Sequence, residues 1–170
     1  MARNVEIKAR IADWEEAHKR AGRIAESGPH RLEQEDVFFR VDRGRLKLRT
    51  ENGKSEVIYY LRENAAGPRE SDYVCLPATD AIATRRILGA IHGERGVVRK
   101  VRWLYLVGQT RIHLDRVEGL GDFLELEVVL RESQNIATGQ AIAREIMERM
   151  GVGQKQLVDF AYVDLAERGG

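Results

Sequence analysis

The chain has 170 residues, of which 43% are hydrophobic and 32% are charged. This length suits a single domain with a sizeable core, and the hydrophobic fraction argues against a disordered chain. Lysine and arginine number 28 and aspartate and glutamate number 27, so the net charge is only +1, which argues against a general nucleic-acid binder. Any functional charge must therefore be separated in space.

The single cysteine, Cys75, excludes an intrachain disulfide and a thiolate zinc site. No apolar run approaches the ~20 residues that a membrane-spanning helix needs, and residues 1–6 lack the apolar stretch of a secretion signal. We therefore expect a cytoplasmic protein without a membrane or nucleic-acid partner, organised as one domain over residues 1–170. A homodimer is left open.

Apolar and polar residues alternate along much of the chain, which is typical of strands because successive side chains point to opposite faces. Residues 4–11 alternate strictly, and glycine-containing turns such as Asp42-Arg43-Gly44 separate neighbouring segments. The pattern predicts eight strands, at about residues 4–11, 37–42, 45–49, 56–63, 69–76, 97–107, 109–117 and 122–131.

Helices are predicted at four places. Asp13 and Glu16 form a capping box that opens the first helix, and Gly93 and Gly151 end the second and the third. The expected helices cover about residues 13–26, 80–93, 135–150 and 157–165. The result is an α+β fold, in which mostly antiparallel strands carry helices packed on the outside.

Charged residues form stripes along one face of these strands. On a single strand such a stripe is most simply a solvated face, but the apolar strand faces and the apolar helix faces also need to be buried together. If the helices cover the apolar face, the charged stripes are left on the opposite face, and eight strands suffice to close a barrel around them. The stripes hold nine cations, Lys8, Arg10, Arg45, Lys47, Arg49, Arg62, Lys100, Arg102 and Arg111, and four anions, Glu6, Asp115, Glu125 and Glu127.

A lumen with so many like charges would repel itself strongly unless a polyanion and a metal ion completed it. Lysine and arginine form charge-assisted hydrogen bonds with phosphate oxygens. Carboxylates repel phosphate but bind a hard cation such as Mg²⁺ or Mn²⁺, which bridges carboxylate and phosphate. The charge pattern therefore predicts a closed barrel with a polar lumen that binds a triphosphate together with a divalent metal ion.

Several motifs follow one another over essentially the whole chain. They include Asn4-Val5-Glu6-Ile7-Lys8, Arg45-Leu46-Lys47-Leu48-Arg49, Gly67-Pro68-Arg69-x-Ser71-Asp72-Tyr73, Arg111-Ile112-x-Leu114-Asp115 and Gly119-Leu120-Gly121-x-Phe123-x-Glu125-x-Glu127. Together they resemble the CYTH superfamily, also called triphosphate tunnel metalloenzymes. The blocks that begin at Gly67 and Gly119 are most similar to the branch of class IV adenylate cyclases and thiamine triphosphatase-like proteins.

The resemblance implies an eight-stranded antiparallel tunnel, a triphosphate substrate (ATP, thiamine triphosphate or inorganic triphosphate) and Mg²⁺ or Mn²⁺ as the cofactor. Matched by position, it implies Glu6, Glu125 and Glu127 as metal ligands. The implied substrate-binding cations are Lys8, Arg49, Arg62, Lys100, Arg102 and Arg111. The implied catalytic residues are Asp115, Lys100 and Arg102.

Asn4 departs from the family pattern, which has a carboxylate at this position. Its amide oxygen can bind a metal ion but carries no charge, so a second metal would be held less strongly. His113 shares the face of Arg111 and Asp115, and we interpret it either as a proton carrier or as a polar filler of the lumen.

Two reactions stay open. Attack by water gives a phosphohydrolase, whereas attack of the ribose 3′-hydroxyl on the α-phosphate of ATP gives cyclic AMP and pyrophosphate. The alternative from a different class is a non-catalytic sensor that binds a triphosphate or polyphosphate, and Asn4 favours it. A lipocalin-like carrier of apolar ligands is opposed by the charged stripes.

Overall fold

The computed structural model describes residues 2–62 and 67–168, without the side chains of Ala2, Arg62 and Arg69. Its elements are β1 (Ala2–Arg10), α1 (Trp14–Ile24), β2 (Ser27–Phe39), β3 (Arg45–Glu51), β4 (Lys54–Arg62), β5 (Arg69–Pro77), α2 (Ala81–His92), β6 (Glu94–Val107), β7 (Thr110–Val117), β8 (Gly121–Val129), α3 (Ile136–Arg149), the 3₁₀ helix η1 (Gln154–Gln156) and α4 (Tyr162–Arg168). Within these described ranges, no helix is long and apolar enough to cross a lipid bilayer.

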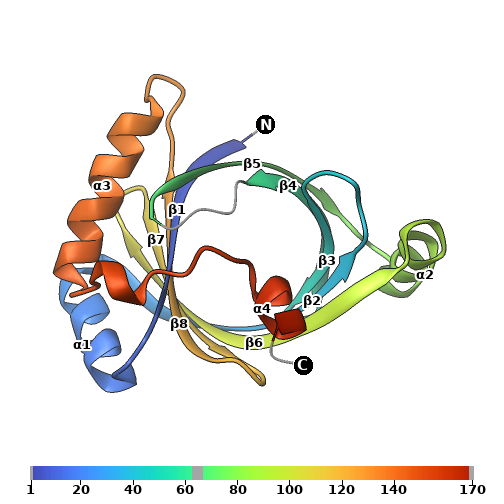
Figure 1. Cartoon of the computed structure of the whole chain (residues 1–170), viewed down its shortest axis with the longest axis horizontal. Helices are drawn as coiled ribbons and strands as arrows, with labels where there is room; N and C mark the ends of the chain where they lie inside the picture. The colour runs from blue at the N-terminus through green and yellow to red at the C-terminus, as the bar shows by residue number, and fades with distance from the viewer. Residues whose placement is uncertain (1, 63–66, 169–170) are drawn as a thin grey trace.

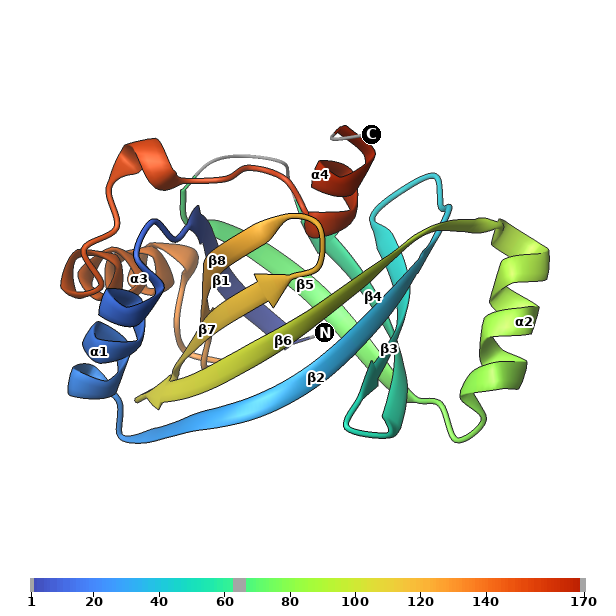
Figure 2. The same ribbon diagram turned by 90° about the horizontal axis from the view of Figure 1, so that it is seen from below.

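The strands form a closed barrel in the order β1-β5-β4-β3-β2-β6-β7-β8, and every neighbouring pair is antiparallel. Figure 1 looks into the barrel, and Figure 2 shows it from the side. The predicted eight-stranded antiparallel barrel is thus confirmed. Closure leaves no open sheet edge and directs alternate residues of each strand into the lumen.

The apolar core lies outside the barrel, beneath the helices. α1 and α3 cover β1, β7 and β8, where Ile7, Ile112 and Leu126 are fully buried (Figure 1). α2 packs on β2 and β3, and its Leu88 joins the cluster around Phe39. Because the apolar side chains are buried on this outer face, the charged stripes face the lumen, as the sequence predicts.

β2 differs from its prediction at both ends. It begins at Ser27 instead of residue 37, and it ends at Phe39 instead of residue 42. Most side chains of its first half are exposed, so the sequence there shows no alternation of apolar residues. Pairing of this half with the backbone of β6 holds it in the sheet. A strand segment that is held only by pairing with its neighbour cannot be recognised from apolar–polar alternation in the sequence.

The C-terminal segment differs from the prediction of a helix over residues 157–165. The amide of Val158 donates to the carbonyl of Lys8 at 2.8 Å, so this part is extended beside β1. The helix α4 begins only at Tyr162. α4 and the segment before it lie across one opening of the barrel, whereas α1, α2 and α3 pack on its outer face (Figure 1).

Candidate functional site

A polar cavity of about 170 Å³ occupies the lumen and is lined by residues from all eight strands and from α4. Its charged lining residues are Glu6, Lys8, Asp36, Lys47, Arg49, Glu56, Lys100, Arg111, Glu125 and Glu127. The strand register brings them together, because Glu6 lies opposite Glu127 and Lys8 lies opposite Glu125 in the β1–β8 ladder. The lumen is therefore ionic, which is the opposite of an apolar carrier cavity.

Asp36 on β2 links two cations of β3. Its carboxylate accepts two hydrogen bonds from Arg49, at 2.7 and 2.8 Å, and one from Lys47 at 2.9 Å. Burial alone would raise the pKa of Asp36, but the two cations hold it well below its usual value. Burial and the neighbouring Arg49 lower the pKa of Lys47 to about 8, despite the opposing effect of Asp36. Lys47 therefore loses its proton at a lower pH than an ordinary lysine.

Asp115 on β7 is fully buried and forms a second centre of this kind. It accepts two hydrogen bonds of 2.7 Å from Arg102 and one of 2.8 Å from the hydroxyl of Tyr162, and Nζ of Lys100 lies 3.2 Å away. Burial opposes ionisation, but Arg102 and Lys100 keep the pKa of Asp115 well below its usual value. The side chain of Tyr162 extends from the start of α4 into the lumen, where the centre of its ring lies 3.5 Å from Nζ of Lys8.

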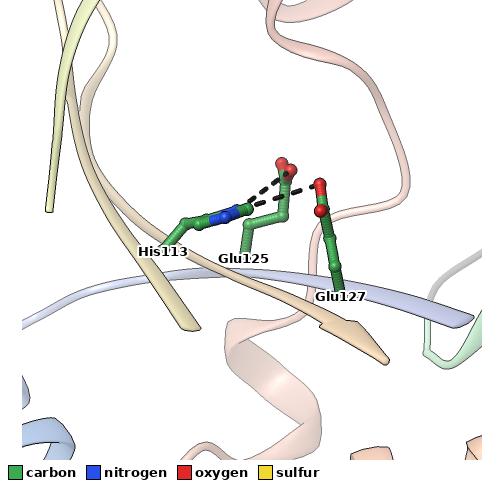
Figure 3. Close-up of side chains that lie close together, drawn as sticks. All are labelled: His113, Glu125 and Glu127. Carbon is green, nitrogen blue, oxygen red and sulfur yellow. Dashed lines mark ion pairs between the residues drawn. The ribbon is translucent and has the colours of Figure 1, made fainter. Parts of the chain in front are cut away.

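Glu125 and Glu127 on β8 lie beside His113 of β7 (Figure 3). Lys8 donates to Oε2 of Glu125, and Oε2 of Glu127 is 3.6 Å from a guanidinium nitrogen of Arg111. Burial would raise the pKa of Glu125, but Lys8 and the neighbouring cations hold it well below its usual value. One ligand atom from each of His113, Glu125 and Glu127 lies within 4.8 Å of the others, so these residues fit a metal ion.

The predicted site residues whose side chains are described lie in the lumen or next to it. Those that line the cavity are Glu6, Lys8, Arg49, Lys100, Arg111, Glu125 and Glu127. Arg102 and Asp115 form the buried pair described above. Arg62 ends β4, but its side chain lies outside the described part of the structure. Arg10, one of the stripe cations, is exposed at the rim, with a guanidinium nitrogen 3.5 Å from the carbonyl oxygen of Leu120.

Besides Glu56 of the cavity lining, three further residues of the site were missed from the sequence. Asp36 belongs to the part of β2 that was not predicted as a strand, although its separation of two residues from Phe38 places both on one face. Tyr162 and Asp164 belong to α4, and no sequence pattern indicates that this helix crosses the opening. Asp164 accepts a hydrogen bond of 2.7 Å from Arg45. Because Asp36 and Asp164 add negative charge, the lumen is less cationic than the stripes predict.

A larger hollow, of about 830 Å³, lies on the outer face of the barrel over β2, β6 and β7. Apart from Lys100, which also lines the lumen, its charged residues lie at the surface and include pairs such as Arg99 with Glu35 at 2.8 Å and Arg116 with Asp122 at 3.3 Å. Such exposed pairs contribute little energy and are common on ordinary surfaces. The lumen, where the charges are buried, is therefore the candidate site.

The fold and the site together define a closed antiparallel barrel around an ionic cavity. The chain belongs to the CYTH domain family, whose model matches residues 2–162.

Similar curated proteins include "Putative adenylate cyclase MJ0240" of Methanocaldococcus jannaschii, which is 24% identical over 95% of this chain and 97% of that protein. "Adenylate cyclase CyaB" of Aeromonas hydrophila is 27% identical over 80% of this chain and 73% of that protein. Among solved structures, the PH1012 protein of Pyrococcus horikoshii OT3 is 26% identical, with a TM-score of 0.86 over 95% of this chain and 98% of that one. HpAC1 from Hippeastrum shares the fold at 15% identity, with a TM-score of 0.69 over 98% of this chain and 96% of that one.

Proposed function

We propose that this chain, acting as one CYTH-like domain, is a divalent-metal-dependent enzyme that acts on a triphosphate bound in the barrel lumen. The observation that carries the proposal is the group of cations of β3 and β6 in or next to the lumen, of which Lys47, Lys100 and Arg102 are buried. Buried cations repel one another, and a bound polyanion removes that cost through charge-assisted hydrogen bonds. Carboxylates in the same cavity supply the ligands for a metal ion.

Each predicted residue has a place in this proposal. The phosphates bind Lys8, Arg49, Arg62, Lys100, Arg102 and Arg111. Asp115 fixes Lys100 and Arg102 beside the phosphate that reacts. Glu6, Glu125 and Glu127 hold Mg²⁺ or Mn²⁺, which when bound offsets negative charge on the phosphate oxygens and on the leaving group. Catalysis then comes from position and charge, without covalent modification of the protein.

The attacking group decides the product. If water attacks the γ-phosphorus, the bond from that phosphorus to the β,γ-bridging oxygen breaks, the diphosphate leaves with that oxygen, and inorganic phosphate forms with loss of a proton from the water. If the ribose 3′-oxygen of ATP attacks the α-phosphorus, cyclic AMP forms and pyrophosphate leaves. Two similar curated proteins are named as adenylate cyclases, and the Hippeastrum structure is described as revealing a dominant triphosphatase activity. Both reactions therefore belong to the proposal, and a product assay separates them.

The test is a product screen on ATP, inorganic triphosphate and thiamine triphosphate, each with Mg²⁺ and with Mn²⁺. We expect at least one triphosphate to be converted, and EDTA to abolish the conversion. Cyclic AMP with pyrophosphate indicates the cyclase, and release of inorganic phosphate indicates the hydrolase. The absence of both conversion and binding for all three compounds would refute the proposal.

Asn4 supports a second candidate, a non-catalytic sensor of triphosphate or polyphosphate. Asn4 is 3% exposed, and its Oδ1 has no hydrogen-bond partner among the described residues. It offers a metal ion one neutral oxygen where a carboxylate would add a full charge. Tight binding of a triphosphate without any product in the same screen would favour the sensor over the enzyme.

The lowered pKa of Lys47 makes triphosphate binding pH-dependent. Below pH 8 the ammonium group is charged, and above it the free protein increasingly holds a neutral amine. Since the polyanion binds the charged form, we expect the affinity to fall by up to about tenfold per pH unit as the pH rises above 8. Calorimetric titration with inorganic triphosphate measures this.

The matched control is Lys47→Arg, because a guanidinium keeps its charge throughout this range. Ionisation of the triphosphate itself affects both proteins equally, so only the difference between them reports on Lys47. Equal pH profiles for the wild type and Lys47→Arg would show that Lys47 does not contribute to binding.

A further inference from the structure

His113 has a buried ring nitrogen that the fold leaves without a hydrogen bond. The residue is 4% exposed, and its Nδ1 has no hydrogen-bond partner among the described residues. A buried polar atom without a hydrogen bond destabilises the fold, because it has lost its contacts with water and gained none in return. A space-filling role does not explain why this nitrogen is left unpaired. A ligand bound to the nitrogen would explain it.

The nitrogen faces one oxygen from each of two carboxylates. Nδ1 lies 3.8 Å from Oε1 of Glu125 and 3.8 Å from Oε1 of Glu127, which is too long for a hydrogen bond. Figure 3 shows the ring and both carboxylates pointing toward a common space. Two ligands that each lie about 2.1 Å from a shared ion are about 3 to 4 Å apart, so the observed separation suits a metal ion.

The other oxygen of each carboxylate is already held by a cation. Lys8 donates to Oε2 of Glu125, and Arg111 lies 3.6 Å from Oε2 of Glu127. Outer contacts of this kind orient metal ligands and leave the inner atoms available for the ion. Among the described residues, Arg102 also donates a hydrogen bond of 3.4 Å to one inner oxygen, Oε1 of Glu125, which the ion would share.

We propose that Nδ1 of His113 binds the metal ion together with Glu125 and Glu127, so that the site prefers Mn²⁺, Co²⁺ or Zn²⁺ to Mg²⁺. Imidazole nitrogen suits these ions, whereas Mg²⁺ selects oxygen ligands. This inference rests on the proposed function, which places a metal site in the lumen. It adds a nitrogen ligand to that site and a preference among divalent ions.

The test uses the full chain stripped of metal by EDTA, without any triphosphate. Pulsed electron paramagnetic resonance on the wild-type protein with Mn²⁺ detects a directly bound nitrogen, and the visible absorption of Co²⁺ measures affinity. We expect nitrogen coupling in the wild type, its loss in His113→Leu, and a fall in Co²⁺ affinity of about 10-fold to 100-fold. In His113→Asn, which keeps a short neutral ligand, we expect the preference for Co²⁺ over Mg²⁺ to decrease.

His30→Leu is the matched control, because His30 is exposed on β2 and contacts Ser27. We expect it to bind Co²⁺ like the wild type. Wild-type protein that binds no Co²⁺, or that binds Mn²⁺ without nitrogen coupling, would overturn the inference even if His113→Leu fails to fold. The metal-binding measurement needs no substrate, whereas the product screen tests the proposed function. A negative result in one experiment can therefore be distinguished from a negative result in the other.

Discussion

Glu127→Gln should lower the turnover of a triphosphate by about 100-fold or more, on the scale of losing one preorganised charge-stabilising group. Glu127 lies opposite Glu6 in the β1–β8 ladder and opposite Arg111 in the β7–β8 ladder, so it is positioned between a second carboxylate and a cation that we propose to bind phosphate. The substitution keeps the shape of the side chain and removes the charge that we propose to hold the metal ion. Steady-state kinetics with Mg²⁺ and Mn²⁺ measure the loss.

Glu118→Gln provides the control for this prediction. Glu118 is an exposed glutamate in the turn between β7 and β8, outside the lumen, and we expect its substitution to leave turnover unchanged. Calorimetry should show that Glu127→Gln still binds inorganic triphosphate, since it removes a negative charge from the cavity. Near-normal turnover of Glu127→Gln would show that Glu127 is not a metal ligand.

Asp115→Asn should destabilise the protein by about 3 to 5 kcal/mol, the range expected when one partner of a buried ion pair is removed. The side chains of Arg102 and Lys100 are 4% and 3% exposed, so both stay buried after they lose this counterion. Urea denaturation measures the change. As a control, Asp122→Asn breaks the exposed pair with Arg116 and should cost at most about 1 kcal/mol.

The same substitution should strengthen triphosphate binding. In Asp115→Asn the carboxylate charge is gone, so Arg102 and Lys100 can donate their hydrogen bonds to the phosphates instead. We expect the Kd for inorganic triphosphate to fall by about tenfold, the scale of one charge-assisted hydrogen bond. A less stable protein with a tighter ligand is a combination that general damage to the fold does not produce. Weaker binding, or unchanged stability, would contradict the assignment of this pair.

Much of the site could be predicted because the alternation of residues along a strand determines which side chains share one face. Once residues 4–11 and 122–131 are recognised as strands, every second residue must face the same side, which groups Glu6 with Lys8 on one strand and Glu125 with Glu127 on the other. The pairing of β1 with β8 then brings the two groups together. The prediction that the charged side chains point into the barrel followed from the need to bury the apolar strand faces beneath helices. Ile7 and Leu126, which are buried in the core beneath the helices, confirm it.

The rest depends on contacts that alternation does not encode. Asp36 was missed because residues 27–36 show no alternation of apolar residues, so the strand was predicted to begin only at residue 37, whereas pairing with β6 extends it back to Ser27. Tyr162 and Asp164 were missed because the position of α4 depends on how residues 157–158 pair with the end of β1. His113 was placed on the correct face, but a single histidine in a strand does not reveal which atoms surround its ring.

The most direct test of the account is a crystal structure of the protein with inorganic triphosphate and Mn²⁺. We expect phosphate density inside the barrel, in contact with Arg49 and Lys100, with the metal ion beside Glu127. A triphosphate bound only in the hollow on the outer face, with the lumen cations still paired to Asp36 and Asp115, would contradict it.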